Sequence, residues 1–305
     1  MIAVQIQLLT DRSLVQVSGP DAEKFLQGLV TLDMGRFNLV DRLYGGLLSP
    51  QGKVLFEFFI LDLADGFGTN FWIDIAKSTV ADFIKRLSMY KLRADIRIED
   101  VSAWHRVAYS CDPDYIKTIG AHAPGIYRLL RPDIWPNIEL PDIKRFNISE
   151  PDDLDELLAA NGNVPPVPDY DTRRIALGIP EGGKDYAFGT LFPHEAMFDQ
   201  LGGVSFEKGC YVGQEIVSRM QHRGTARSRF LIVNGAGPLP PMGTEVFAGA
   251  TPLGAMGSSS GTQGLALVRL DRLADACKAG QSITIGGLPV TFTKPPYATF
   301  DVPGS

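Results

Sequence analysis

The apolar residues of the N-terminal half follow two periods, one typical of helices and one typical of strands. Helical spacing runs through residues 18–29 and 78–87. Continuous or alternating apolar runs, which predict strands, lie at residues 2–9, 13–17, 54–61, 71–75 and 92–99. Strand pairs followed by helices and further strands predict antiparallel sheets with helices on one face, an α+β architecture.

Residues 54–61 form the most continuous of these apolar runs, and Glu57 is its single charge. A carboxylate inside a buried strand is costly unless it is paired, and burial raises the pKa of a carboxyl group. Two interpretations follow: the strand face opens into a ligand cavity, or an edge strand turns Glu57 towards water. Because Phe56 and Phe58 flank this carboxylate and indicate burial on both faces, we favour the cavity.

The rest of the chain is organised by turn residues. Residues 104–147 predict strands separated by proline-rich turns, and residues 149–161 predict a helix that leads to a stiff connector near residues 161–172. From about residue 230, short strands alternate with dense glycine, proline and serine turns, which predicts a small β-barrel. We therefore expect residues 1–228 to form one region of two subdomains, and residues 229–305 to form a C-terminal barrel.

Composition and charge narrow the class of protein. The 305 residues carry a net charge of −6, which argues against non-specific nucleic-acid binding, although a local basic patch stays open. Cys111, Cys210 and Cys277 are odd in number and widely spaced, which suits a reducing compartment. No apolar run approaches the 18 residues of a membrane span, and the first ten residues read as a strand rather than a targeting peptide. We expect a cytoplasmic protein.

Cys210 has the most suggestive surroundings of any thiol in the chain. From Val212 onwards the apolar residues recur at helical spacing, so Cys210 is predicted at or just before the first turn of a helix. Unpaired amide groups at a helix start favour a thiolate, and Lys208 adds positive charge in the same sense. A thiolate is a nucleophile, a redox group or a soft-metal ligand. The alternative is a small buried apolar residue, which is the usual fate of a free cysteine.

A short basic segment follows the predicted helix. Its cationic or titratable side chains are Arg219, His222, Arg223, Arg227 and Arg229. Two interpretations stay open: a site for an anion, or a solvated face that borders the last domain. The four histidines lack the spacing of metal ligands, so we expect no metal site of the protein's own.

Residues 208–215, with the sequence KGCYVGQE, resemble the signature of the YgfZ/IBA57 family. The resemblance extends to residues 25–33, 44–55, 90–93 and 174–181. It implies an aminomethyltransferase-like folate-binding fold of antiparallel sheets and helices with a small C-terminal β-barrel. The implied function is that of a tetrahydrofolate-binding accessory protein for assembly or repair of iron–sulfur clusters, mainly those of [4Fe–4S] enzymes.

The resemblance also implies roles for particular residues. Cys210 and Lys208 would be catalytic, and Cys210 would be a ligand of a transient cluster shared with an A-type carrier protein, since a cluster usually needs four ligands. The partners would be folate, that carrier and client [4Fe–4S] enzymes. The implied folate contacts are Glu57, Arg174, Glu181, Tyr211, Gln214, Glu215, Arg219 and Arg223.

Two further function classes remain. The related aminomethyltransferases carry two adjacent aspartates where this chain has Phe56-Glu57, and one of those aspartates holds and activates the folate. That difference, together with a cysteine signature that the transferases lack, favours an accessory factor over a conventional enzyme. The alternative is a folate-dependent one-carbon (aminomethyl) transferase that uses the same pocket. The third reading is a pure binding module with an inert, buried thiol.

Overall fold

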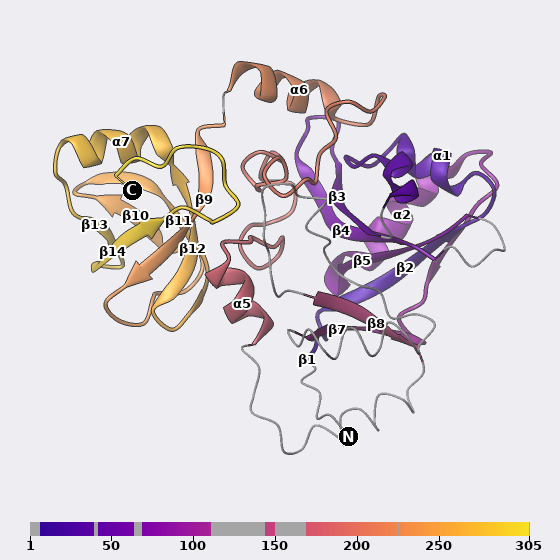
Figure 1. Ribbon diagram of the computed structural model, residues 1–305, viewed down its shortest axis with the longest axis horizontal. Helices are drawn as coiled ribbons and strands as arrows, with labels where there is room; N and C mark the ends of the chain where they lie inside the picture. Colours follow the sequence, from indigo (N-terminus) through magenta and orange to yellow (C-terminus); the bar gives the residue numbers. More distant parts are fainter. Residues whose placement is uncertain are drawn as a thin grey trace, which may run out of the picture. The chain divides into compact units, whose positions relative to one another are not determined.

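The computed structural model describes residues 7–39, 42–63, 69–110, 144–149, 169–224 and 226–304 (Figure 1). The helix predicted at residues 149–161 and most of the proline-rich strands predicted between 104 and 147 lie outside the described residues, as does Cys111. The α+β prediction is confirmed, because antiparallel sheets and helices precede a closed barrel. No helix in the described part of the chain is long and apolar enough to span a membrane.

The chain divides into two compact units, each assembled from separate segments. The first, which we call the N-unit, comprises Met1–Leu47, Phe56–Tyr170 and Glu207–Val212. The second, the barrel unit, comprises Leu48–Leu55, Asp171–Phe206 and Gly213–Ser305. The sequence suggested a boundary at residue 228 and, within the region before it, two subdomains with a connector near residues 161–172. The compact unit that contains the barrel also includes earlier stretches of chain, and one of them begins at Asp171.

The N-unit is built on a five-stranded sheet. In spatial order its strands are β3 (Arg42–Leu48), β4 (Val54–Asp62), β5 (Asn70–Ala76), β2 (Arg12–Ser18) and β6 (Arg97–Asp100). Helix α2 (Val80–Lys91) packs against β2 and β6 with the predicted apolar face of Val80, Phe83 and Leu87. The last strand is shorter than predicted. Leu92 is the first apolar residue of the alternating run 92–99, which predicts that it points inwards, but it ends α2 at φ 44° and is 89% exposed.

Other elements complete the N-unit. A second sheet in the order β1 (Gln7–Leu8), β7 (His105–Ser110) and β8 (Lys144–Ser149) is antiparallel throughout. Helix α1 (Ala22–Gln27) leads into the short 3₁₀ helix η1 (Met34–Asn38), and a second one, η2 (Lys77–Thr79), precedes α2. The segment between α1 and η1 is therefore a bend of six residues, and it carries the site described below.

The predicted C-terminal barrel is present. Its strands close in the order β10 (Glu245–Ala248), β11 (Thr251–Ser260), β12 (Gln263–Arg269), β9 (Ser228–Gly235), β14 (Leu288–Thr293) and β13 (Ile283–Ile285). Aliphatic side chains such as Leu231, Val246 and Val268 fill its interior, and α7 (Leu270–Lys278) packs against β11 and β12. Helices α5 (Tyr170–Ala176) and α6 (Gln214–Arg223) precede the barrel in sequence.

Glu57 lies on a buried strand, as its neighbours indicated. Strand β4 has β3 on one side and β5 on the other, and Glu57 is 6% exposed. The interpretation of an edge strand with Glu57 in water is therefore wrong. The cavity that was predicted beside Glu57 stays a prediction.

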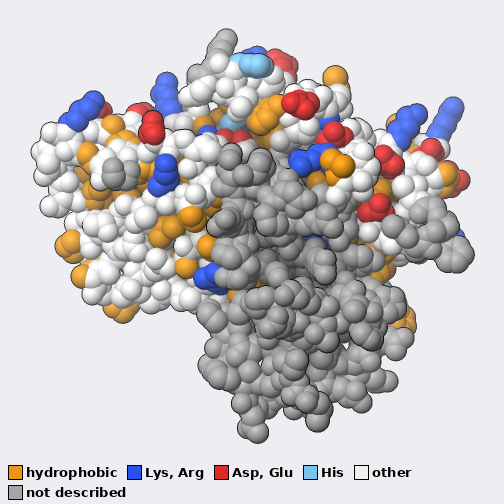
Figure 2. All heavy atoms as spheres, in the orientation of Figure 1, with side chains coloured by type: hydrophobic (Ala, Val, Ile, Leu, Met, Phe, Trp, Pro, Cys, Tyr) orange, Lys and Arg blue, Asp and Glu red, His pale blue; other side chains and the backbone are white. Residues whose placement is uncertain are grey.

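Charged side chains of both signs are interspersed over the described part of the face drawn in Figure 2. Lys and Arg side chains there alternate with Asp and Glu side chains rather than gathering in one large field. A mixed surface of this kind fits the modest net charge of −6.

Candidate functional site

Cys210 lies on a loop, Glu207–Val212, that we call the thiol loop. Cys210 and the preceding Gly209 are exposed, and a Cβ placed on Gly209 would meet no atom within 4 Å. The thiol is free and exposed. The alternative reading of Cys210 as a small buried apolar residue is wrong, and the sulfur is open to a reagent or a partner molecule.

Lys208, two residues before this thiol, is buried at 8% exposure. Its Nζ donates hydrogen bonds to three backbone carbonyl oxygens, those of Gln27 (2.7 Å), Val30 (2.8 Å) and Leu32 (2.7 Å). We call these three oxygens the ammonium cradle. An ammonium group has three N–H donors, so the cradle fills its donor capacity. The thiol loop is thereby bonded to a bend about 180 positions earlier in the sequence.

The bend that carries the cradle is held in shape by its own polar side chains. Asp33 Oδ1 accepts hydrogen bonds from Gln27 Nε2 (2.9 Å) and from the amide of Gly35 (3.1 Å). Gln27 Oε1 accepts from the amide of Met34 (2.8 Å). The bend between α1 and η1 is thus closed by side chains at both of its ends, which turns its carbonyl groups towards one point.

Burial and charge set the protonation of this site. Burial lowers the pKa of Lys208 to about 8, while the negative charge of Asp33 opposes the shift, as do the carbonyl acceptors, which favour the charged form. Lys208 is therefore an ammonium at neutral pH. Its Nζ lies 5.2 Å from the centre of the Tyr211 ring, and burial raises the pKa of Tyr211 to about 12.

The helix after the thiol loop starts later than predicted. Gly213, at φ 83°, is the N-cap of α6, and the helix begins at Gln214. Cys210 precedes that cap by three residues, so its predicted place at or just before the first turn is corrected. Cys210 therefore lies outside the first turn of α6. The helix dipole acts mainly within the first turn. The three N–H groups of Lys208 donate to the cradle.

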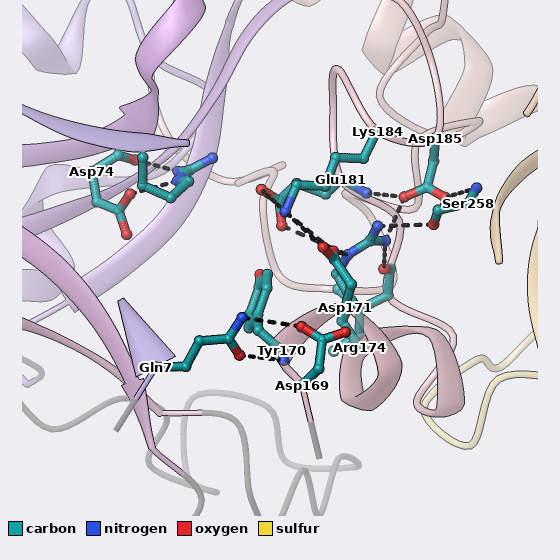
Figure 3. Close-up of polar contacts among 12 residues, drawn as sticks. Gln7, Asp74, Asp169, Tyr170, Asp171, Arg174, Glu181, Lys184, Asp185 and Ser258 are labelled. Atoms are coloured by element: carbon teal, nitrogen blue, oxygen red, sulfur yellow. Dashed lines mark hydrogen bonds and ion pairs between the residues drawn. The ribbon is translucent and has the colours of Figure 1, made fainter. Parts of the chain in front are cut away.

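Arg174 and Glu181, which the family resemblance implied as folate contacts, belong to a buried network in the barrel unit (Figure 3). The guanidinium of Arg174 bonds Asp171 (2.6 Å), Asp185 (2.5 Å) and the hydroxyl of Ser258 (2.8 Å). Glu181 lies 3.9 Å from the same guanidinium. We call this group the arginine network.

Asp185 is the centre of the arginine network. Besides Arg174, its carboxylate accepts from the amide of Glu181 (2.8 Å) and from the amide (2.8 Å) and hydroxyl (2.6 Å) of Ser258. A Cβ on Gly257 would stand 2.6 Å from Asp185 Oδ1, so this position needs glycine. The network ties α5, the turn after it and β11 together. Since the Arg174 side chain has 0% exposure, a ligand would reach it only if the network opened.

The remaining implied folate contacts lie at the start of α6 and along it. Glu215 and Arg219 form an exposed ion pair one helical turn apart (2.7 Å), and Gln214 is half-buried. The side chain of Arg223 lies outside the described residues. Arg229, from the same basic segment, is buried and forms two hydrogen bonds to Asp199 (2.7 and 2.9 Å). The segment therefore divides into solvated and internal members.

The predicted site residues fall into the two units. The N-unit contains Glu57, Lys208, Cys210 and Tyr211, and the barrel unit contains the residues at 174, 181, 214, 215 and 219. Sequence reasoning missed the structural role of Asp33 and Ser258. Gln27 and Asp33 belong to the family-like stretch 25–33, so the resemblance did mark them, but nothing in the residue types showed that the backbone of this stretch would bind an ammonium group.

Comparison with solved structures defines the class of fold. The chain aligns with the glycine cleavage system aminomethyltransferase T from Bartonella henselae at a TM-score of 0.74, over 97% of this chain and 86% of that one, with 14% sequence identity. The predicted aminomethyltransferase-like fold is confirmed. Residues 227–300 match the family model of the CAF17 C-terminal beta-barrel domain, in agreement with the barrel from β9 to β14.

Comparison with curated proteins defines the family. The iron–sulfur cluster assembly factor IBA57 of Mus musculus is 31% identical over 87% of this chain and 77% of its own length. Homologues in Neurospora crassa and Dictyostelium discoideum are 33% and 31% identical over 73% and 74% of this chain. The chain belongs to the IBA57 family. It spans 52% and 61% of the lengths of the Neurospora and Dictyostelium proteins.

The predicted cytoplasmic location is contradicted by this comparison. The Mus, Neurospora and Dictyostelium relatives are all named as mitochondrial proteins. The prediction rested on the absence of a targeting pattern in the first ten residues, and the absence of such a pattern is too weak a signal to decide a compartment.

Proposed function

We propose that this chain is an accessory factor in the assembly or repair of iron–sulfur clusters, mainly those of [4Fe–4S] enzymes, and that it acts through Cys210. The family relationship supports the role, because the relatives are named as iron–sulfur cluster assembly factors. One observation carries the proposal: the free thiol of Cys210 is exposed on a loop whose neighbouring residue, Lys208, is bonded into the protein interior.

The chemistry suits a cluster that passes through the protein as its cargo. Thiolates are the usual ligands of iron–sulfur clusters, and a cluster usually needs four of them. Within the described residues no group of three or more His, Cys, Asp or Glu side chains could hold a metal ion. Cys210 would therefore supply one ligand and an A-type carrier protein the others, so that the cluster bridges the two proteins.

A reduced folate is the cofactor that we propose for the N-unit. A buried carboxylate accepts hydrogen bonds from N–H groups, which a pterin ring presents, and Glu57 provides such a carboxylate at 6% exposure. Arg174 and Glu181 fit this role poorly because their charges are already bonded inside the arginine network. Glu57 is the charged member of the implied folate contacts in the N-unit, so the folate proposal is tested at this residue.

Cluster transfer can be tested by anaerobic reconstitution with an A-type carrier, followed by absorption and EPR spectroscopy. Wild-type protein should develop the spectrum of a bridging cluster, and Cys210→Ser should lose it. Cys277→Ser is the matched control, because Cys277 is also a free, exposed cysteine. Equal spectra for wild type and Cys210→Ser would overturn the proposed role of the thiol.

Folate binding can be tested separately by titration calorimetry with tetrahydrofolate. Glu57→Gln should weaken binding at least about tenfold, the usual cost of a lost charge-assisted hydrogen bond. Glu245→Gln, which changes an exposed carboxylate of β10, should have no effect. No heat of binding to wild type would remove folate from the proposal. Formation of methylene-tetrahydrofolate from an aminomethyl-lipoyl donor would instead favour the aminomethyl transferase.

A further inference from the structure

The ammonium cradle has the geometry of a binding site for a primary ammonium group. Its three carbonyl oxygens lie 2.7, 2.8 and 2.7 Å from Lys208 Nζ, within the range of charge-assisted hydrogen bonds. They belong to Gln27, Val30 and Leu32. In a continued α-helix these carbonyls would not converge, because each would point along the helix axis to the amide four residues later. The bend after α1 therefore presents oxygens that are free to accept from a side chain.

The cradle is attached to the sheet of the N-unit. The amide of Thr31 donates to the carbonyl of Gly46 (2.9 Å), and the amide of Gly46 donates to Thr31 Oγ1 (2.9 Å). Val30 forms an antiparallel bridge with Leu47. Both partners belong to β3, so the cradle is fixed relative to the sheet. A group bonded to the cradle is therefore positioned relative to the sheet.

The thiol loop combines exposed and buried residues. Glu207, Gly209 and Cys210 are exposed, whereas Lys208 and Tyr211 are buried. The four-carbon stem of Lys208 thus crosses from the exposed backbone to the interior, and its ammonium group is the part that bonds there. We propose that Lys208 is a positioning residue whose ammonium, seated in the cradle, fixes the exposed thiol of Cys210 relative to β3.

This assignment differs from the role that the sequence suggested for Lys208. A neighbouring charge would act on the thiol by favouring its thiolate form, and a positioning residue would act by restricting where the sulfur can be. The use made of the thiol rests on the proposed function. The positioning itself is a property of the isolated protein, so it can be tested without iron, folate or a carrier.

The cradle should also discriminate between cations. An ammonium is compact and has three donors, while a guanidinium is planar and has five in a fixed fork. Three oxygens that converge within 2.8 Å of a single nitrogen suit the first shape. Lys208→Arg should therefore behave like a loss of the ammonium group and not like a conservative change.

The test uses a protein in which Cys111 and Cys277 are replaced by serine and Cys210 carries a nitroxide spin label. EPR line shapes report the mobility of the label, and hydrogen exchange reports protection of the amides at residues 29–32 and 209–212. In Lys208→Met and Lys208→Arg the label should become mobile and these amides should exchange at least about tenfold faster. Lys91→Met changes the last residue of α2 and is the matched control.

The pH profile of Cys210 alkylation separates the two roles. Loss of a positioning residue should leave its midpoint unchanged while the label becomes mobile. A raised midpoint with an immobile label would assign Lys208 to the electrostatic role and overturn the proposal, as would rescue by Lys208→Arg.

A measurement on the wild type keeps the proposal open to refutation even if these variants do not fold. The ¹⁵Nζ spectrum of lysine-labelled protein should contain one ammonium signal whose hydrogens exchange slowly, because all three are bonded and shielded from water. A spectrum in which every lysine ammonium exchanges rapidly would overturn the proposal. Since no cluster is involved, a failure here is distinct from a failure of the reconstitution experiment.

Discussion

Each unit buries a cation from a family-like stretch, and the two units stabilise it by different means. In the barrel unit Arg174 is surrounded by carboxylates, with Asp171 and Asp185 at 2.6 and 2.5 Å. In the N-unit Lys208 meets three backbone carbonyls. Carboxylates carry a full opposite charge, whereas carbonyls offer only dipoles. The first arrangement holds a permanently charged arginine in ion pairs, and the second leaves a lysine whose protonation can change.

The arginine network should show the largest effect on stability. Arg174→Met leaves the Asp185 carboxylate buried without its cation, and breaking a buried ion pair from one side typically costs about 3–5 kcal/mol. We expect a loss of that size in the free energy of unfolding, measured by urea denaturation. Because Arg174 holds α5 to β11, near-native stability would mean that the carboxylates are protonated or hydrated instead, and the comparison would fail.

The cradle should show an intermediate effect. Lys208→Met removes three hydrogen bonds but leaves no fully buried carboxylate without its cation, so we expect a loss of about 1–3 kcal/mol in the free energy of unfolding. Differential scanning calorimetry of both variants gives the order directly. A loss larger than that of Arg174→Met would show that carbonyl dipoles stabilise a cation here better than carboxylates do.

The pH dependence of stability should distinguish the two cations more sharply than the size of the destabilisation does. Burial lowers the pKa of Lys208 to about 8, below the value near 10.4 of an unfolded chain. Between these values the unfolded state binds more protons, so the contribution of Lys208 to stability rises with pH and is lost as pH falls through 8. Arginine stays charged throughout.

Urea unfolding at pH 8, 9 and 10 tests this difference. The destabilisation caused by Lys208→Met should grow with pH across this window, and that caused by Arg174→Met should show no change assignable to residue 174. A destabilisation by Lys208→Met that stays constant or shrinks would place the folded pKa of Lys208 at or above its unfolded value.

The smallest effect should come from the exposed pair on α6. Arg219→Ala removes an ion pair whose side chains are 52% and 83% exposed, and exposed pairs of this kind contribute less than about 0.5 kcal/mol. The change should also leave tetrahydrofolate affinity unaltered in titration calorimetry. A measurable loss of affinity would restore the anion-site interpretation of the basic segment.

Much of the fold follows from patterns that local sequence contains. The barrel was visible in its short strands and dense turns, and burial of Glu57 followed from the phenylalanines on either side. The start of α6 was predicted too early because Val212 matches the apolar spacing. The helix begins only after Gly213, which is its N-cap and has a left-handed conformation (φ 83°). Leu92 was placed inside because alternation alone ignores the end of α2.

The arrangement around Lys208 could not be predicted from the sequence. Its acceptors are backbone carbonyls 176 to 181 positions away, and a sequence records side chains but not which carbonyls are left unbonded by a bend. The same limit applies to Arg174, whose partner Ser258 lies 84 positions further on in β11. Residue types identified both cations as notable, but only the tertiary structure shows what neutralises each.

The unit boundary between Val212 and Gly213 affects how this protein can be divided into fragments. The compact units meet in sequence between these two residues, so the eight-residue signature 208–215 is divided, with lysine, cysteine and tyrosine on one side and Gly213-Gln214-Glu215 on the other. A fragment limited to either unit would inherit an incomplete signature. The eight residues form one continuous motif in the sequence, whereas the fold divides them between the N-unit and the barrel unit.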